Sequence, residues 1–441
     1  MSGADPTVLN NAKHGNLAKI LTSADSIWEP QGFARKNIFA TDNTFSSKPT
    51  GQPANFGGTD RFRFRKRGGR VSRVWMKITA SAGVVAAANS AAYVDDYGQL
   101  ILEDVRIEYS SKEIQQYNGE FLKAYKRLME HSITQEHYAA TNFALLPPGA
   151  GGFEAVRQAN VSAITVVFPE LEWFYFTRSE DYAMTPEALS SELELVVRYR
   201  RLEQLVYARV TATGALVGAD PFTTRPAITE SLLFTQLIHT PGPEKEMHLR
   251  RFDTPQGLLF KILDVEQQVR QSITALAGIH TIKLDNFRLD SQFIIFFVRR
   301  VDIDTDWAVD RMQSSTTTTI LNGGAPAVTD DTSALLPIAS FRLIANGKAI
   351  VDPCTDVENR AVWRKLYWPG SQVAEAIYFI PFSHMLRDHR NVVNYQNLAN
   401  LGSLELELTM PVSTSARLVD VYNVCHNAVQ KKQGDIIRLL R

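Results

Sequence analysis

Few residues in this sequence have the types and spacing that chemistry at a metal ion requires. A histidine pair on a strand must stand at alternate positions so that both imidazole rings point to one face. His131 and His137 are six positions apart, and His384 and His389 are five apart. Neither pair shares a strand or helix face, so the sequence predicts no metal site and no cofactor.

An acidic segment resembles a calcium-binding loop only in part. Carboxylates at nearby positions can converge on a hard cation, and they occur here at Asp302, Asp304, Asp306 and Asp310. A calcium loop needs glycine at its sixth position and a bidentate glutamate at its twelfth, where this chain has Trp307 and Gln313. We interpret the segment as a solvated acidic loop.

Motifs for covalent or phosphate chemistry are missing from the sequence. It has no P-loop, no dinucleotide fingerprint, no nucleophile elbow and no zinc-protease motif. Sugar cleavage needs a paired acid and base, and no such pair stands out. The aromatic run Trp173-Phe174-Tyr175-Phe176 could stack on a carbohydrate, but it lies in an expected apolar strand and is typical of a core. We therefore expect a protein that is not an enzyme.

The sharpest charged feature is a basic run just after residue 60. Its members are Arg61, Arg63, Arg65, Lys66, Arg67 and Arg70. The run could contact an anionic partner, such as nucleic-acid phosphates, lipid headgroups or a partner subunit, and added salt would weaken that contact. It also fits an outer strand on which Phe62 and Phe64 face the core while the arginines stay in water. The sequence favours the outer strand over nucleic-acid binding, so no specific nucleic-acid recognition is expected.

Charge and composition limit which partners the chain can have and which class of protein it can belong to. The 441 residues include 47 basic and 47 acidic ones, but residues 1–70 hold 11 basic and 5 acidic ones. The N-terminal region could therefore face something anionic while the rest of the chain, with a net charge of −6, does not. An apolar content of 44% supports well-filled cores and excludes wholesale disorder.

The cysteines and apolar runs bear on the compartment. Cys354 and Cys425 are the only cysteines, too few for a disulfide framework or a zinc cluster and typical of a reducing compartment. No secretory signal is visible, and apolar runs such as 293–298 are too short to span a bilayer. We expect a soluble protein, with peripheral membrane contact left open.

Residue periodicity predicts β structure arranged as two similar halves. Residues 61–65 alternate strictly between polar and apolar, as a half-buried strand should, and many short strands follow. A fixed order of matched elements at long spacing indicates duplicated architecture. The matched segments are the strand pairs 62–78 and 284–298, the echoed segments 105–114 and 341–350, the helices 120–130 and 358–368, the aromatic runs 166–169 and 378–382, and the Leu-Glu-Leu strands 193–195 and 404–406.

These features together resemble a known family, the double jelly-roll major capsid proteins of large eukaryotic double-stranded DNA viruses, in the iridovirus-like nucleocytoplasmic group. The likeness is clearest in the second half, at 376–383, 394–398, 404–406 and 422–424, and the first half is similar at 102–109, 121–128, 166–168 and 173–176. The family's Pro-Ser-Gly stretch is missing, and His389-Arg390-Asn391 stands in its region.

The resemblance implies an all-β fold of two tandem jelly-roll β-sandwiches with short helices in the loops. The predicted parts are an N-terminal arm at 1–57, a first jelly roll at 58–210, a linker at 211–230 and a second jelly roll at 231–441. The inserts 80–92 and 314–319 are expected to be exposed loops. The arm and the stretch 231–280 have no evident counterpart in each other, so specific contacts are expected there.

In function, the resemblance implies a structural major capsid protein located in the capsid shell of the virion and assembled in the host cytoplasm. Two lobes per chain would let a homotrimer form a pseudo-hexameric capsomer that tiles an icosahedral shell. The implied partners are other copies of the chain, neighbouring capsomers, minor capsid proteins and an inner viral membrane. A minor capsid or scaffold protein of the same fold, and a carbohydrate-binding or carbohydrate-cleaving β-sandwich protein, are the alternatives.

Overall fold

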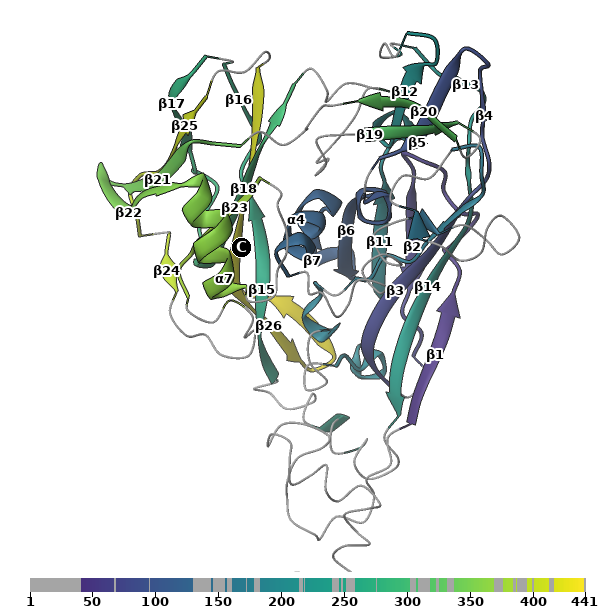
Figure 1. Cartoon of the computed structure of the whole chain (residues 1–441). Helices are drawn as coiled ribbons and strands as arrows, with labels where there is room; N and C mark the ends of the chain where they lie inside the picture. The colour runs from purple at the N-terminus through teal and green to yellow at the C-terminus, as the bar shows by residue number, and fades with distance from the viewer. Residues whose placement is uncertain are drawn as a thin grey trace, which may run out of the picture.

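Two β-sandwich lobes lie side by side in the computed structural model of the chain (Figure 1). The structure describes residues 41–439, apart from gaps that fall mainly at 130–160, 178–182, 240–257, 302–317, 331–336, 369–375, 384–394 and 412–415. Antiparallel strands dominate both lobes, which confirms the predicted all-β class.

The first lobe consists of two antiparallel sheets. One has the strand order β1-β14-β3-β10, continued by the short β8 and β9, and the other has the order β2-β11-β6-β7. The strands are β1 (Thr41–Ser47), β14 (Ile228–His239), β3 (Arg70–Ala80), β10 (Thr165–Val167), β8 (Ala144–Leu145), β9 (Ala155–Val156), β2 (Thr59–Arg63), β11 (Leu193–Tyr199), β6 (Leu102–Tyr109) and β7 (Lys112–Tyr117).

The second lobe repeats this arrangement strand for strand. Its sheets have the orders β15-β26-β18-β23 and β17-β25-β21-β22, with β16, β24 and β27 pairing at the margins. The strands are β15 (Leu258–Gln267), β26 (Arg417–Lys432), β18 (Asp290–Arg300), β23 (Ile377–Pro381), β17 (Gly278–Lys283), β25 (Leu404–Met410), β21 (Ser340–Ala345), β22 (Lys348–Thr355), β16 (Gln271–Ile273), β24 (Gln396–Asn397) and β27 (Asp435–Arg438). Two sandwiches of one topology confirm the predicted pair of jelly rolls.

The matched hairpins show how closely the copies agree. The hairpin β6–β7 turns at Ser110 and Ser111, with φ of 49° and 62°, and β21–β22 turns at Asn346 and Gly347, with φ of 51° and 74°. Two consecutive residues with positive φ make the two-residue turn whose twist suits adjacent antiparallel strands. The echoed sequence therefore encodes the same turn in both lobes.

The boundary between the lobes differs from the prediction. Strand β13 (Phe222–Thr224) pairs with β4 (Val84–Val85), and β14 pairs with both β1 and β3. Residues assigned to the linker 211–230 and to the start of the second jelly roll at 231 thus belong to sheets of the first lobe. The alternating apolar residues of β14 cover the first core, and the chain reaches the second lobe only between β14 and β15.

Strand pairing also corrects the view that the arm and the stretch 231–280 lack counterparts. Strand β1 lies within the predicted arm, and β15 lies within that stretch. Each is the edge strand of its sheet, next to β14 in one lobe and to β26 in the other. The two strands are therefore equivalent members of the duplicated fold. Residues 1–40 of the arm lie outside the described residues.

The inserts expected to be loops contain short strands. Strand β5 (Asn89–Tyr93) pairs with β12 (Val206–Val210), and β4 lies just before it. The second insert contributes β19 (Thr318–Asn322), which pairs with β20 (Ala325–Asp330), and this hairpin lies beside β5 and β12 of the first lobe (Figure 1). The small residues of the first insert, such as Ala91 and Ala92, are buried rather than exposed.

Each lobe has a helix at the matching place, after its hairpin. These are α4 (Gly119–Met129) in the first lobe, and the π-helix η8 (Glu358–Trp363) continued by α7 (Arg364–Tyr367) in the second. Asn118 caps α4, because its Oδ1 accepts a hydrogen bond from Phe121 N at 2.7 Å. A Cβ on Gly119 would lie 2.3 Å from the carbonyl oxygens of Gln99 and Leu102, so only glycine fits there.

Candidate functional site

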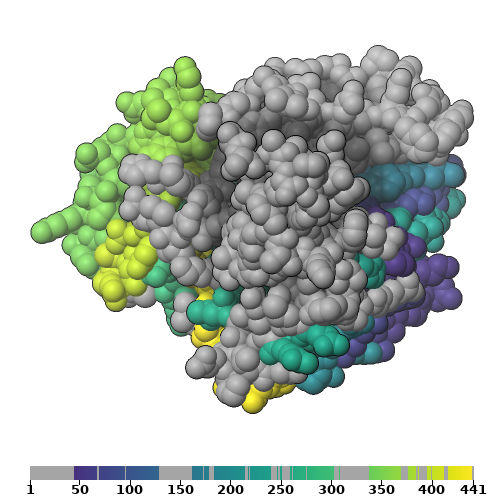
Figure 2. Space-filling model, turned by 90° about the horizontal axis from the view of Figure 1, so that it is seen from below, coloured from purple at the N-terminus to yellow at the C-terminus, as the bar shows by residue number. Residues whose placement is uncertain are grey.

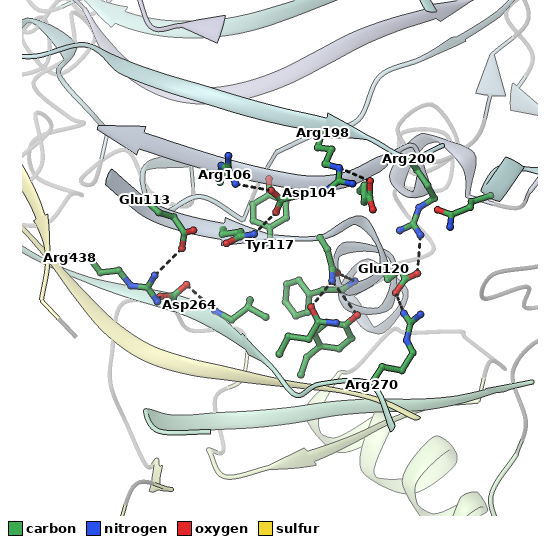
Figure 3. A pocket seen from close by; sticks show the side chains of 18 residues that line it. Asp104, Arg106, Glu113, Tyr117, Glu120, Arg198, Arg200, Asp264, Arg270 and Arg438 are labelled. Carbon is green, nitrogen blue, oxygen red and sulfur yellow. Dashed lines mark hydrogen bonds and ion pairs between the residues drawn. The ribbon is translucent and has the colours of Figure 1, made fainter. Parts of the chain in front are cut away.

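The two lobes meet along a seam that contains a cleft of about 680 Å³ (Figure 3). The first lobe lines the cleft from β6, β7, β11 and the start of α4, and the second lobe lines it from β15, β26 and Arg438. Charged side chains of both signs dominate its walls, among them Asp104, Arg106, Arg198 and Asp264. The cleft therefore lies at the contact between the two lobes.

Strand periodicity explains why the first-lobe wall is charged. In β6, Val105 and Ile107 point into the core, so Asp104 and Arg106 point away from it. Strand β11 does the same with Arg198, whose Nε lies 3.0 Å from Glu103 Oε2. One face of this sheet thus carries a lattice of ion pairs, while the other face fills the sandwich.

The beginning of the predicted basic run lies in this lattice. Arg61 Nη1 lies 3.0 Å from Glu108 Oε2 and 3.1 Å from Glu194 Oε2. Arg63 pairs with Glu194 at 3.3 Å and with Glu192 at 3.1 Å. Hydrogen bonds to Glu194 and Glu108 raise the pKa of Arg61. Both arginines therefore already have acidic partners within the chain.

The rest of the basic run is dispersed. Arg65 is exposed, Lys66 Nζ donates a hydrogen bond to Leu189 O at 2.6 Å, and Arg70 is buried. Arg67 lies outside the described residues. Phe62 and Phe64 are buried in the core, as the outer-strand interpretation predicted. The run is thus not one continuous basic surface, and its contact with an anionic partner stays a prediction.

A buried ion network joins the lobes at the edge of the cleft. Glu120, at the start of α4, lies 3.1 Å from Arg200 of its own lobe and 2.8 Å from Arg270 of the second lobe. Asp420 of β26 lies 2.7 Å from Arg270 and 2.8 Å from Arg299. Glu120 and Asp420 have almost no exposed side-chain surface. Two buried carboxylates therefore hold three arginines across the seam.

The C-terminal hairpin β26–β27 forms a second connection. Its turn lies against the first lobe, where the Tyr109 hydroxyl lies 2.9 Å from Gly434 O and 2.8 Å from Asp435 Oδ1. Ser190 N donates to Gly434 O at 2.8 Å. Farther along β27, Arg438 forms ion pairs with Glu113 of the first lobe and with Asp264 of the second. The hairpin thus ties the end of the chain to both lobes.

Burial shapes the titration of the cleft carboxylates. It raises the pKa of Asp104, with Gln116 and Arg106 opposing the change. It also raises the pKa of Glu113, where the charge of Arg438 opposes it. These groups have polar or basic partners and no arrangement resembling a general acid and base about a substrate. Ion pairs between the two lobes line the cleft.

The structure describes some of the other candidate residues, and the rest lie outside the described residues. The aromatic run is buried, with Trp173 only 1% exposed, so it cannot stack on a carbohydrate. It forms the core as predicted, but Tyr175–Thr177 is a 3-10 turn and not a strand. The acidic segment is outside the described residues except for Trp307, and so are the histidines of both pairs. Among the described residues, no group of three or more potential metal ligands converges.

Membrane-spanning helices are likewise absent from the part of the chain that the structure describes, where none is long and apolar enough to cross a bilayer.

Comparison with known proteins shows similarity in sequence over the first half of the chain and in fold over nearly all of it. Residues 26–225 match the family model described as the major capsid protein N-terminus. By fold, the chain is similar to the PBCV-1 virus capsid, with a TM-score of 0.66 and 13% identity over 91% of this chain and 98% of that one. The chain has the fold of the double jelly-roll capsid proteins.

Further matches agree with this assignment. The chain is similar to the Faustovirus major capsid protein, with a TM-score of 0.63 and 12% identity over 97% of this chain and 98% of that one. It is also similar to a chain of the Sputnik virophage, with a TM-score of 0.56 and 11% identity over 91% and 88% of the two chains. No curated protein matches it by sequence. Identities this low show a shared fold, and residues 26–225 are in addition similar to the N-terminal part of major capsid proteins.

No sequence motif marks the residues that join the two lobes at the seam. Glu120, Arg270 and Asp420 stand far apart in the chain, and none belongs to a recognisable motif. One signal was available for the surface lattice, because Arg63 of β2 lies directly opposite Glu194 of the Leu-Glu-Leu strand β11. Directly opposite charges on neighbouring strands favour each other.

Proposed function

We propose that the chain is a capsid protein, three copies of which form a pseudo-hexameric capsomer, and that such capsomers tile an icosahedral shell. The observation that carries the proposal is the pair of topologically identical lobes joined by the buried network of Glu120 and Asp420. Three rigid two-lobed chains around a threefold axis give six similar lobes. That outline packs on a hexagonal lattice.

Rigidity of the seam matters for this function. A capsomer imitates a hexagon only when the angle between its two lobes is the same in every chain. Glu120 and the C-terminal hairpin act at separate places along the seam, which restrains rotation of one lobe on the other. The zero net charge of the chain suits dense lateral packing, because a large charge of one sign would repel neighbours.

The partners of the capsomer follow from the same proposal. Neighbouring capsomers contact its sides, and minor capsid proteins and an inner viral membrane contact its inner surface. Assembly takes place in the host cytoplasm, where a reducing medium suits the two buried, free thiols of Cys354 and Cys425.

Sedimentation of the purified chain tests the proposal. We expect one species with three times the 49.4 kDa mass of the chain over a wide range of concentrations. A species of 49.4 kDa at every concentration, with no larger assembly, would rule the trimer out.

A further inference from the structure

The insert that follows β18 leaves the second lobe and lies over the first. Its hairpin β19–β20 lies beside β5 and β12, the short sheet at one end of the first lobe. Figure 1 shows this hairpin on the first-lobe side, whereas β18 and β21, which flank the insert in sequence, belong to the second lobe. Seen from below in Figure 2, the light green residues of the second lobe and the purple first strands lie at opposite ends of the molecule. The insert therefore reaches from one lobe to the other.

One residue of this insert is buried in the first lobe. Trp307, which stands where a calcium loop would need glycine, is only 5% exposed. Its backbone N–H donates a hydrogen bond to Glu203 O at 2.9 Å, and its carbonyl oxygen accepts one from Ala208 N, also at 2.9 Å. Ala208 lies on β12. Trp307 thus bonds the backbone of two first-lobe residues.

The indole ring of Trp307 has first-lobe partners as well. It meets the ring of Phe222 edge-on, with centroids 5.8 Å apart, and the guanidinium carbon of Arg225 lies 5.4 Å from its centre. An aromatic face attracts both a ring edge and a cation, because it carries partial negative charge. Arg225 is held in turn by Glu203 at 2.9 Å and by Asp220 at 2.6 Å. We call Glu203, Ala208, Phe222 and Arg225 the seat of Trp307.

The backbone conformation of Trp307 shows how strongly the seat fixes it. Its φ is 63°, in the left-handed region that a bulky side chain rarely adopts. A residue keeps such a conformation only when its surroundings over-determine it, and such residues gather at places with a specific task. The seat supplies hydrogen bonds to the backbone and aromatic and cationic contacts to the ring. Together they indicate an anchor.

We propose that Trp307 anchors the insert between β18 and β21 to the first lobe as a strap, so that the lobes are joined at a third place besides the network of Glu120 and the C-terminal hairpin. Contacts at three separate places restrain rotation of one lobe on the other. The inference concerns a single chain and does not depend on the proposed trimer. Because the strap and its seat belong to one chain, their contact is independent of protein concentration.

Amide hydrogen exchange of the full chain reports the strap directly, because a first-lobe N–H, that of Ala208, is covered by a second-lobe carbonyl. Mass spectrometry follows the peptide that contains Ala208. Trp307→Ala removes the ring and is expected to speed exchange there by at least about tenfold, since exchange follows local opening of the strap. Trp307→Phe keeps a ring against Phe222 and is expected to stay within about threefold of the wild type.

Two further variants separate the anchor from general stability. Arg225→Gln removes the cation over the ring, and its side chain is 52% exposed, so the lobe keeps its fold. Exchange at Ala208 is expected to rise by a smaller factor than in Trp307→Ala. The matched control is Tyr395→Ala, which removes a 48% exposed ring that packs on His426 within the second lobe. Exchange at Ala208 is expected to be unchanged in this control.

Exchange in the other first-lobe peptides, measured in the same spectra, shows whether a variant unfolds as a whole. We expect the acceleration to be confined to the peptides around Ala208. Wild-type exchange at Ala208 in Trp307→Ala overturns the strap. If Trp307→Ala unfolds the whole lobe, wild-type exchange in Arg225→Gln overturns it instead. Protection of Ala208 that appears only at high protein concentration places the insert of a second copy in the seat, which also contradicts the strap.

Discussion

Glu120 of the first lobe and Arg270 of the second form an ion pair at 2.8 Å across the seam. Arg270 also contacts Asp420, and Glu120 also contacts Arg200, so this pair is the middle of the network that joins the lobes. Buried charged side chains thus form part of the contact between the two jelly rolls.

Glu120→Gln is expected to destabilise the protein by about 3 kcal/mol, because it leaves three arginines with one buried carboxylate. Arg63→Gln is the comparison, since it removes an exposed pair and is expected to cost less than about 1 kcal/mol. Urea unfolding measures both. Equal midpoints for the two variants would show that the seam network does not stabilise the fold.

The arginines after residue 60 are expected to differ in their effect on membrane binding. Arg61 and Arg63 are held by Glu108, Glu192 and Glu194, so Arg61→Ala/Arg63→Ala should leave binding to anionic vesicles unchanged. Arg65→Ala/Arg67→Ala should weaken it, most visibly at low salt. Vesicle co-sedimentation measures the effect. If vesicle binding is absent, or is equal in both variants, the basic run does not contact a membrane.

Asp96 gives the first lobe a defined acid sensitivity. Burial opposes its ionisation, but the charges of Arg127 and Lys123 prevail and lower its pKa to about 2. The folded pKa is below the ordinary value, so about 2 kcal/mol of stability is present above about pH 4 and is lost as the pH falls through 2. Asp96→Asn should abolish this dependence in acid unfolding. A variant that keeps the wild-type pH profile contradicts the assignment.

The charged form of Lys431 destabilises the folded protein, whereas the charged form of Asp96 stabilises it. Burial, with the charge of Arg70, lowers the pKa of Lys431 to about 7. Its unfolded pKa is near 10.5, so the folded protein gains stability as the pH rises from 7 to 10 and lacks it below 7. Lys431→Met should therefore stabilise the protein by about 2 kcal/mol at pH 6, with the advantage shrinking toward pH 10. Melting temperatures across that range test this, and a constant difference would refute it.

Local pattern predicted the parts of the fold that depend on neighbouring residues. The inward-pointing Phe62 and Phe64 follow from the strict alternation of polar and apolar residues at 61–65. The predicted domain boundary differs from the structure because β14 resembles the start of a new module in sequence, although its partners β1 and β3 lie far earlier in the chain, as in the pair of Ile228 with Ala80. The seam residues Glu120 and Asp420 were not predictable, since only the packing of one lobe on the other brings them together.

Images of the purified protein down its symmetry axis test the central claim most directly. Negative-stain class averages are expected to show a ring of six lobes with threefold symmetry, in which the two types of lobe alternate. Averages that show isolated two-lobed particles, or rings with another number of lobes, would contradict the account.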